Sequence, residues 1–185
     1  MRKNIFNLRT LIALALLAGL GAVFSAFLSV EIAPTGFKVV EISLTPVPVM
    51  LAGMLFGPLA GGLVGYVADT AGFFMGVQHG AYNPAFSVTM ALFGVIAGLF
   101  YLKSQKNSIL RVSAMSLTAQ VVCSVILNTA FLCIFYPRVF TLFVILPTRA
   151  IAALIELPLY AWLLMVLAEA LRPVINRSFR TAGAS

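Results

Sequence analysis

The chain has 185 residues, of which 62% are apolar and 9% are charged, and its mean hydropathy is +1.07. Such a composition leaves too little polar surface to cover a soluble globule, so it excludes a soluble protein and predicts an integral membrane protein. The formal net charge is +7. We interpret this excess as a sign of membrane topology and of contact with anionic lipids, and not as a nucleic-acid-binding surface.

Six apolar stretches approach the length of about 20 residues that a membrane helix needs. Proline, glycine or charged residues bound each of them. The sequence therefore predicts an all-α membrane protein in which six transmembrane helices form one bundle and a single domain over residues 1–185. We expect helices at about Leu8–Phe27, Ser43–Phe56, Pro58–Met75, Pro84–Leu102, Arg111–Phe135 and Pro147–Leu171, followed by a basic tail over Arg172–Ser185.

The basic residues are divided unevenly between the two sides of the predicted bundle. One side carries Arg2, Lys3, Arg9, Lys103, Lys106, Arg111, Arg172, Arg177 and Arg180, whereas the other carries only Lys38, Arg138 and Arg149. The positive-inside rule therefore predicts that both termini are cytoplasmic. The outer loops are then Ser29–Ile42, Gly76–Asn83 and Tyr136–Leu146, and Arg149 lies near the outer interface.

Two ladders of small residues run along the first predicted helix, Ala15 with Gly19 and Ala18 with Ala22. Small residues four positions apart let helices approach closely. Each ladder could pack inside the bundle or dock another protein, and the spacing alone does not distinguish these uses.

The third predicted helix has a glycine face that also includes an acid, Asp69. This face predicts close helix packing. An acid within the membrane suggests proton or cation coupling. We favour a structural role for Asp69, in which it accepts hydrogen bonds from a tightly packed neighbour. The face consists of Gly57, Gly61, Gly65, Asp69 and Gly72.

Polar residues recur at helical spacing in the last two predicted helices, which suggests two polar faces lining one cavity. An arginine at membrane depth costs about 2.5 kcal/mol or more unless it faces a cavity, a partner or the interface. Arg149 and Asn128, near the outer ends, are therefore the better ligand candidates. Gln120 and Ser124 could equally well bond neighbouring helices, and Glu156 could be a buried partner for Arg149. The two stripes are Ser116, Gln120, Ser124 and Asn128, and Arg149, Glu156 and Tyr160.

Catalytic and nucleotide-binding motifs are missing from the sequence. It has no H-E-x-x-H, no G-x-S-x-G and no G-x-x-x-x-G-K-[ST] segment. The only histidine, His79, has no second imidazole or thiolate at ligand spacing. We therefore expect neither a catalytic site nor a metal site.

Three segments together resemble the substrate-binding (S) subunits of energy-coupling-factor (ECF) vitamin transporters, and the folate group fits best. The segments are Ala52-Gly-Met-Leu-Phe-Gly-Pro58 with the following glycines and Asp69, then Asn128-Thr129, and Leu146-Pro-Thr-Arg149. The chain departs from the folate group's pattern at Asn83-Pro-Ala-Phe-Ser87, at Phe131 and at Ala152.

The resemblance implies a high-affinity vitamin-capture subunit in the plasma membrane of a prokaryote. Because the folate group of the family is the most similar, folate is the expected vitamin. It implies assembly with a membrane coupling subunit and two ATPases, so that ATP is used only by these partners and no cofactor is intrinsic to the chain. In this family the first helix docks to the coupling subunit, which favours a docking role for one of the two small-residue ladders. The outer loop Ile32–Glu41 would gate the pocket.

For a folate, we expect Arg149 to pair with a ligand carboxylate, and Asn128 and Gln120 to hydrogen-bond the heterocycle. The aromatic residues Tyr82, Phe86 and Tyr136 would stack on the ligand or anchor the interface. Glu156 and Ser124 would not contact the ligand themselves but would hold the ligand-binding side chains in position.

Three alternative functions are compatible with the residues. The same scaffold could bind a different vitamin or a precursor. The polar stripes could instead only hold helices together in a structural or assembly protein. An independent channel or carrier is disfavoured, because the two halves show no clear repeat.

Overall fold

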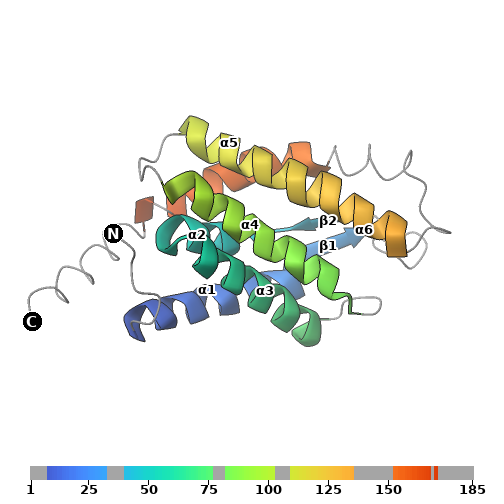
Figure 1. Cartoon of the computed structure of the whole chain (residues 1–185), viewed down its shortest axis with the longest axis horizontal. Helices are drawn as coiled ribbons and strands as arrows, with labels where there is room; N and C mark the ends of the chain where they lie inside the picture. Colours follow the sequence, from blue (N-terminus) through green and yellow to red (C-terminus); the bar gives the residue numbers. More distant parts are fainter. Residues whose placement is uncertain are drawn as a thin grey trace, which may run out of the picture.

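The computed structural model describes residues 8–32, 40–76, 82–102, 109–135, 152–167 and 169–170. These residues form a bundle of six helices, counting α5, η1 and α6 as one continuous helix, together with one short hairpin (Figure 1). The elements are α1 (Leu8–Phe27), β1 (Ser29–Ile32), β2 (Val40–Ser43), α2 (Pro46–Phe56), α3 (Pro58–Met75), α4 (Pro84–Leu102), α5 (Ile109–Ala119), η1 (Gln120–Leu127), α6 (Asn128–Phe135) and a C-terminal helix (Ala152–Leu167).

The centre of the bundle is formed by α2, α3 and α4, which approach one another at glycines. A Cβ added to Gly94 of α4 would lie 2.2 Å from the carbonyl oxygen of Gly61 in α3. A Cβ added to Gly53 of α2 would lie 2.2 Å from the carbonyl oxygen of Gly94. Backbone atoms cannot move aside as a flexible side chain can, so any larger residue must separate these helices. The predicted glycine face is thus a packing surface.

The turn between α2 and α3 depends on a Gly-Pro pair. Gly57 has a φ of 99°, a backbone conformation that residues with a Cβ rarely adopt. Pro58 then begins α3, where its fixed φ suits the first helical position and its missing N–H is no loss. The two helices therefore fold back on each other without a loop.

The two small-residue ladders of α1 face in different directions. Ala22 is buried, and its carbonyl oxygen lies 3.1 Å from the position of a Cβ added to Gly72 of α3. Ala18 is half-buried and packs against the core. Ala15 and Gly19 are exposed, and a Cβ added to Gly19 would meet nothing within 4 Å. The Ala18/Ala22 ladder therefore packs inside the bundle, and the Ala15/Gly19 ladder faces outward.

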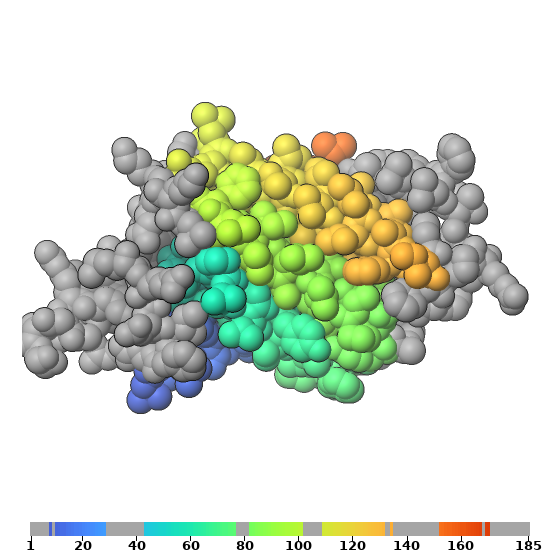
Figure 2. Space-filling model, in the orientation of Figure 1, coloured from blue at the N-terminus to red at the C-terminus, as the bar shows by residue number. Residues whose placement is uncertain are grey.

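The outer surface of the bundle is strongly apolar. Three of the helices in the described part of the chain are long and apolar enough to cross a membrane, namely Thr10–Phe27, Pro84–Tyr101 and Ile109–Phe131. Side chains such as Leu16 and Leu110 are 70% and 79% exposed. Figure 2 shows one face of this surface, where α3, α4 and the α5–α6 helix lie across the molecule. Lipid chains are the natural covering for such a surface.

The predicted outer loop over Ser29–Ile42 contains an antiparallel hairpin that the sequence analysis did not anticipate. β1 and β2 pair in a register that places Ser29 opposite Ser43 and Ile32 opposite Val40. Each strand has four residues, which is too short to give a clear alternating pattern in the sequence.

The second helix begins at Pro46, three residues later than the Ser43 start that the sequence predicted. Ser43 ends β2 instead. Its hydroxyl accepts a hydrogen bond from the Thr45 backbone N–H at 3.2 Å and shares a second one with the Thr45 hydroxyl at 2.6 Å. Such local side-chain bonds compete with helix formation, so the helix starts only where a proline favours it.

The fifth helix begins at Ile109, two residues before the expected Arg111, and is not α-helical throughout. Residues Gln120–Leu127 form a π-helical segment, η1. π-Helical segments are rare in proteins, and those that do occur often lie at functional sites. This one carries part of the polar stripe noted in the sequence.

Candidate ligand-binding site

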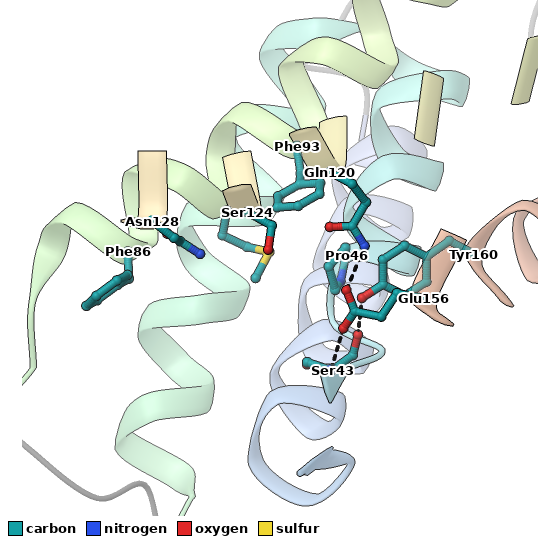
Figure 3. Close-up of a pocket in the computed structure, with 10 residues that line it drawn as sticks. Ser43, Pro46, Phe86, Phe93, Gln120, Ser124, Asn128, Glu156 and Tyr160 are labelled. Carbon is teal, nitrogen blue, oxygen red and sulfur yellow. Dashed lines mark hydrogen bonds between the residues drawn. The ribbon is translucent and has the colours of Figure 1, made fainter. Parts of the chain in front are cut away.

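A cavity of about 80 Å³ lies where the end of β2, α2, α4, η1, α6 and the C-terminal helix meet (Figure 3). A single water molecule needs only about 10–15 Å³, so this space exceeds a packing defect. Its wall consists of Ser43, Pro46, Phe86, Met90, Phe93, Gln120, Ser124, Asn128, Glu156 and Tyr160.

One end of the cavity holds a buried carboxylate and a buried carboxamide. Gln120 and Glu156 are 1% and 4% exposed. Gln120 Nε2 donates to Glu156 Oε2 at 2.7 Å, and the backbone N–H of Ser43 donates to Glu156 Oε1 at 3.2 Å. Tyr160, one turn further along the C-terminal helix, donates its hydroxyl to the Ser43 carbonyl oxygen. The C-terminal helix thus holds both backbone polar groups of the last residue of β2.

Three members of the predicted polar stripe line the cavity: Gln120, Ser124 and Asn128. Gln120 and Asn128 are eight residues apart, which corresponds to about 12 Å along a helix axis. Figure 3 accordingly shows Asn128 toward one end of the site and Gln120 toward the other. The fourth member, Ser116, is fully buried away from the cavity.

Asn128 has an unused hydrogen-bond acceptor. Its side-chain oxygen, Oδ1, is buried and has no hydrogen-bond partner within the described residues. Leaving a buried acceptor unpaired costs about 1–3 kcal/mol. A bound molecule with an N–H or O–H group at this position would remove that cost.

The apolar part of the cavity lining comes mainly from α4. Phe86, Met90 and Phe93 follow one another at spacings of four and three residues, so they lie on one face of the helix. Together with Pro46 they add an apolar surface to the polar groups that η1 and α6 contribute. An apolar lining with a few placed polar groups is typical of sites for small organic ligands.

The sequence pattern of ECF transporter substrate-specific components matches residues 9–171. This is most of the chain. The protein belongs to this family. The resemblance seen in the sequence is thereby confirmed, and so is its consequence that the chain is a transporter component.

Two known proteins of this kind are similar to the chain over most of its length. The folate transporter FolT of Clostridium novyi (strain NT) is 32% identical over 156 residues, which cover 84% of this chain and 85% of that protein. The crystal structure of FolT bound with folic acid matches with a TM-score of 0.75 at 28% identity, covering 89% of this chain and 95% of that chain. The predicted six-helix membrane fold is therefore confirmed.

The sequence predicts that Tyr82 either stacks on a ligand or anchors the interface. It is not among the residues that line the cavity. Its hydroxyl bonds to the Thr70 and Ser87 hydroxyls, each at 3.0 Å. Its ring centroid lies 5.2 Å from that of Phe73 and 5.6 Å from that of Phe74. Tyr82 therefore joins the C-terminal end of α3 to the N-terminal end of α4, whereas Phe86, four residues later, does reach the cavity.

Asp69 belongs to the same polar cluster between α3 and α4. The Ser87 hydroxyl donates to Asp69 Oδ2 at 2.7 Å, and Ser87 also contacts Thr70 at 3.4 Å. This is the role favoured from the sequence, in which a packed neighbour's hydroxyl satisfies the acid. The cluster fixes the start of α4, the helix that carries the apolar wall of the cavity.

Arg149 and Tyr136 lie outside the described residues, so their contacts with a ligand stay predictions. Among the lining residues, the sequence analysis did not name Ser43, Pro46, Met90, Phe93 or Tyr160 as ligand contacts. The helical spacing of Phe86, Met90 and Phe93 could have revealed the apolar wall. Nothing in the sequence signals Ser43, because contacts more than 100 residues away position it.

Proposed function

We propose that this S component captures a folate on the outer side of a prokaryotic plasma membrane and passes it on for ATP-driven import. The observation that carries the proposal is the make-up of the cavity wall. Two carboxamides and a carboxylate line the same cavity as two phenylalanines and a methionine. The relatives named above, one of them bound to folic acid, support the choice of ligand.

Each part of a folate finds a suitable group in or near the cavity. The heterocycle and the adjoining N–H groups need hydrogen-bond partners, which Gln120 and Asn128 supply. The aminobenzoyl ring needs an apolar wall, which Phe86 and its neighbours on α4 supply. The glutamate tail is anionic and needs a cation, for which Arg149 is the candidate because its guanidinium can pair with a carboxylate in bidentate geometry. Tyr136 remains a candidate for the mouth of the site.

The direct test is to purify the protein in detergent, identify any co-purified small molecule by native mass spectrometry, and measure thermal stability with added vitamins. We expect folic acid to bind and to raise the melting temperature. Selective stabilisation by another vitamin would change the ligand but keep the class. If no small molecule binds or stabilises the protein, the transport proposal fails in favour of a structural or assembly role.

Arg149→Ala should weaken the binding of folic acid more than tenfold, because the variant loses a charge-assisted pair with the ligand carboxylate. Isothermal titration calorimetry in detergent measures the change. Arg138→Ala, which removes the other arginine predicted on the outer side, is the matched control and should have little effect. An unchanged affinity in Arg149→Ala would remove this residue from the site.

The proposed import needs a membrane coupling subunit and two ATPases, which would use the ATP. We assign docking of the coupling subunit to the exposed Ala15/Gly19 ladder of α1, because the Ala18/Ala22 ladder already packs on α3. Backbones approach closely at exposed small residues, so a bulky side chain there should prevent docking.

Gly19→Leu should therefore leave the affinity for folic acid unchanged but abolish co-purification with the coupling module and ATP-dependent uptake. The matched control is Ala114→Leu, a small-to-large change at an exposed position of α5. The control should assemble normally. Normal assembly of Gly19→Leu would place the docking surface elsewhere.

A further inference from the structure

We infer that Glu156 is a specificity-determining residue, which accepts hydrogen bonds from the 2-amino group and N3–H of the ligand's pterin ring. This inference rests on the proposed function. It also fixes the direction of the ligand, with the pterin at the Gln120/Glu156 end of the cavity and the rest of the molecule running toward Asn128 and Phe86.

The geometry at this end presents acceptors. Glu156 lines the cavity from the C-terminal helix, and its carboxylate is held from two sides by the Ser43 N–H and the Gln120 amide group. Because Gln120 uses Nε2 for this bond, its carbonyl oxygen is turned away from Glu156, as Figure 3 shows. This end of the site therefore presents the carboxylate oxygens of Glu156, with the amide oxygen of Gln120 at the same end.

The chemistry of the pterin edge matches this arrangement. Its 2-amino group and N3–H are two neighbouring donors that point the same way, like the two N–H groups of a guanidinium. A carboxylate can accept two parallel hydrogen bonds, whereas a carboxamide of the same shape offers one acceptor and one donor. A glutamine at position 156 would turn a donor toward the ligand's own donor, which makes the distinction measurable.

A purely structural role for Glu156 predicts a different outcome, and the structure supplies the control. Glu156 and Tyr160 both hold Ser43, one through its N–H and the other through its carbonyl oxygen. If Glu156 acted only by positioning β2, removing the Tyr160 hydroxyl would disturb the ligand in the same way. Only Glu156 carries the acceptor pair that the pterin edge requires.

The experiment compares the binding of folic acid and 2-deaminofolic acid, which lacks the amino donor, by calorimetry in wild type, Glu156→Gln and Tyr160→Phe. We expect wild type to prefer folic acid by about tenfold or more, since a site built to bond a donor rejects a ligand that lacks it. This preference should largely disappear in Glu156→Gln. Tyr160→Phe should retain it, even if both affinities fall.

The possible results separate the inference from the proposed function. If wild type binds neither compound, the proposed function fails. Equal binding of both by wild type, a preference that persists in Glu156→Gln, or one lost to the same extent in Tyr160→Phe overturns the role of Glu156 while folate capture stands. If Glu156→Gln does not fold, the comparison of wild type with Tyr160→Phe is the test: a preference that is absent in wild type or lost in Tyr160→Phe overturns the inference, and a preference kept in both supports it.

Discussion

Gly94→Ala should destabilise the S component severely, lowering the free energy of unfolding by about 3 kcal/mol. The added methyl group would meet the Gly61 carbonyl oxygen at 2.2 Å, its carbonyl carbon at 2.3 Å and its Cα at 2.8 Å. All three are backbone atoms of α3, so the clash can be relieved only by moving one helix away from the other. For a protein of this size, the expected loss corresponds to a fall in melting temperature of about 10 °C.

The measurement is thermal unfolding in detergent without ligand, with Gly19→Ala as the matched control. Both changes put one methyl group on a helical glycine, but the Cβ at Gly19 meets nothing within 4 Å. The control should therefore keep or slightly raise the melting temperature, since alanine favours a helix over glycine by about 1 kcal/mol. If the two variants melt alike, the close contact between α3 and α4 is wrong.

The effect of Gly94→Ala should extend to ligand binding. Gly94 directly follows Phe93, and the same helix carries Met90 and Phe86 into the cavity. Moving α4 away from α3 would shift this apolar wall as a unit. The glycines thus set the stability of the bundle and also the width of the site.

Much of the fold could be predicted because its signals are local. α3 begins at Pro58 and α4 at Pro84, and their bounds are those expected from the proline, glycine and charge positions alone. The hairpin and the π-helical segment could not be predicted in this way. The strands are too short for a periodic pattern, and the four-residue spacing that marked Gln120, Ser124 and Asn128 does not distinguish an α-helix from a π-helix.

The residues of the candidate site also fall into those that a local sequence signal predicts and those that it does not. Gln120, Ser124 and Asn128 lie on one helix, so periodicity was enough to bring them to one cavity. Ser43 reaches the cavity only because Glu156 and Tyr160 of the C-terminal helix hold its backbone. Such a contact between residues far apart in the sequence leaves no periodic signal. For Tyr82 the sequence left two roles open, stacking on a ligand or anchoring the interface, and it gave no sign that hydroxyl groups of α3 and α4 hold this residue outside the cavity lining.

Asn128→Leu should weaken the binding of folic acid about a hundredfold and yet raise the melting temperature of the ligand-free protein. Both effects have one cause, the buried Oδ1 atom that has no partner among the described residues. Without a ligand, this unpaired acceptor lowers the free energy of unfolding by about 1–3 kcal/mol. A leucine of similar size removes the acceptor and with it this cost. With a ligand, the same leucine leaves a donor of the folate without its acceptor at this position, and affinity falls.

Ser116→Ala provides the matched control, because Ser116 belongs to the same polar stripe and its Oγ is also buried without a partner in the described part of the chain. Ser116 does not line the cavity. Its replacement should stabilise the protein without changing affinity, as calorimetry and thermal unfolding of the two variants would measure. A stabilised Ser116→Ala variant with unchanged affinity, together with a stabilised Asn128→Leu variant with weakened affinity, would mark Asn128 as an acceptor kept unpaired for the ligand. A lower melting temperature in Asn128→Leu would mean that its amide already has a partner in the folded protein, and unchanged affinity would mean that the ligand does not reach it.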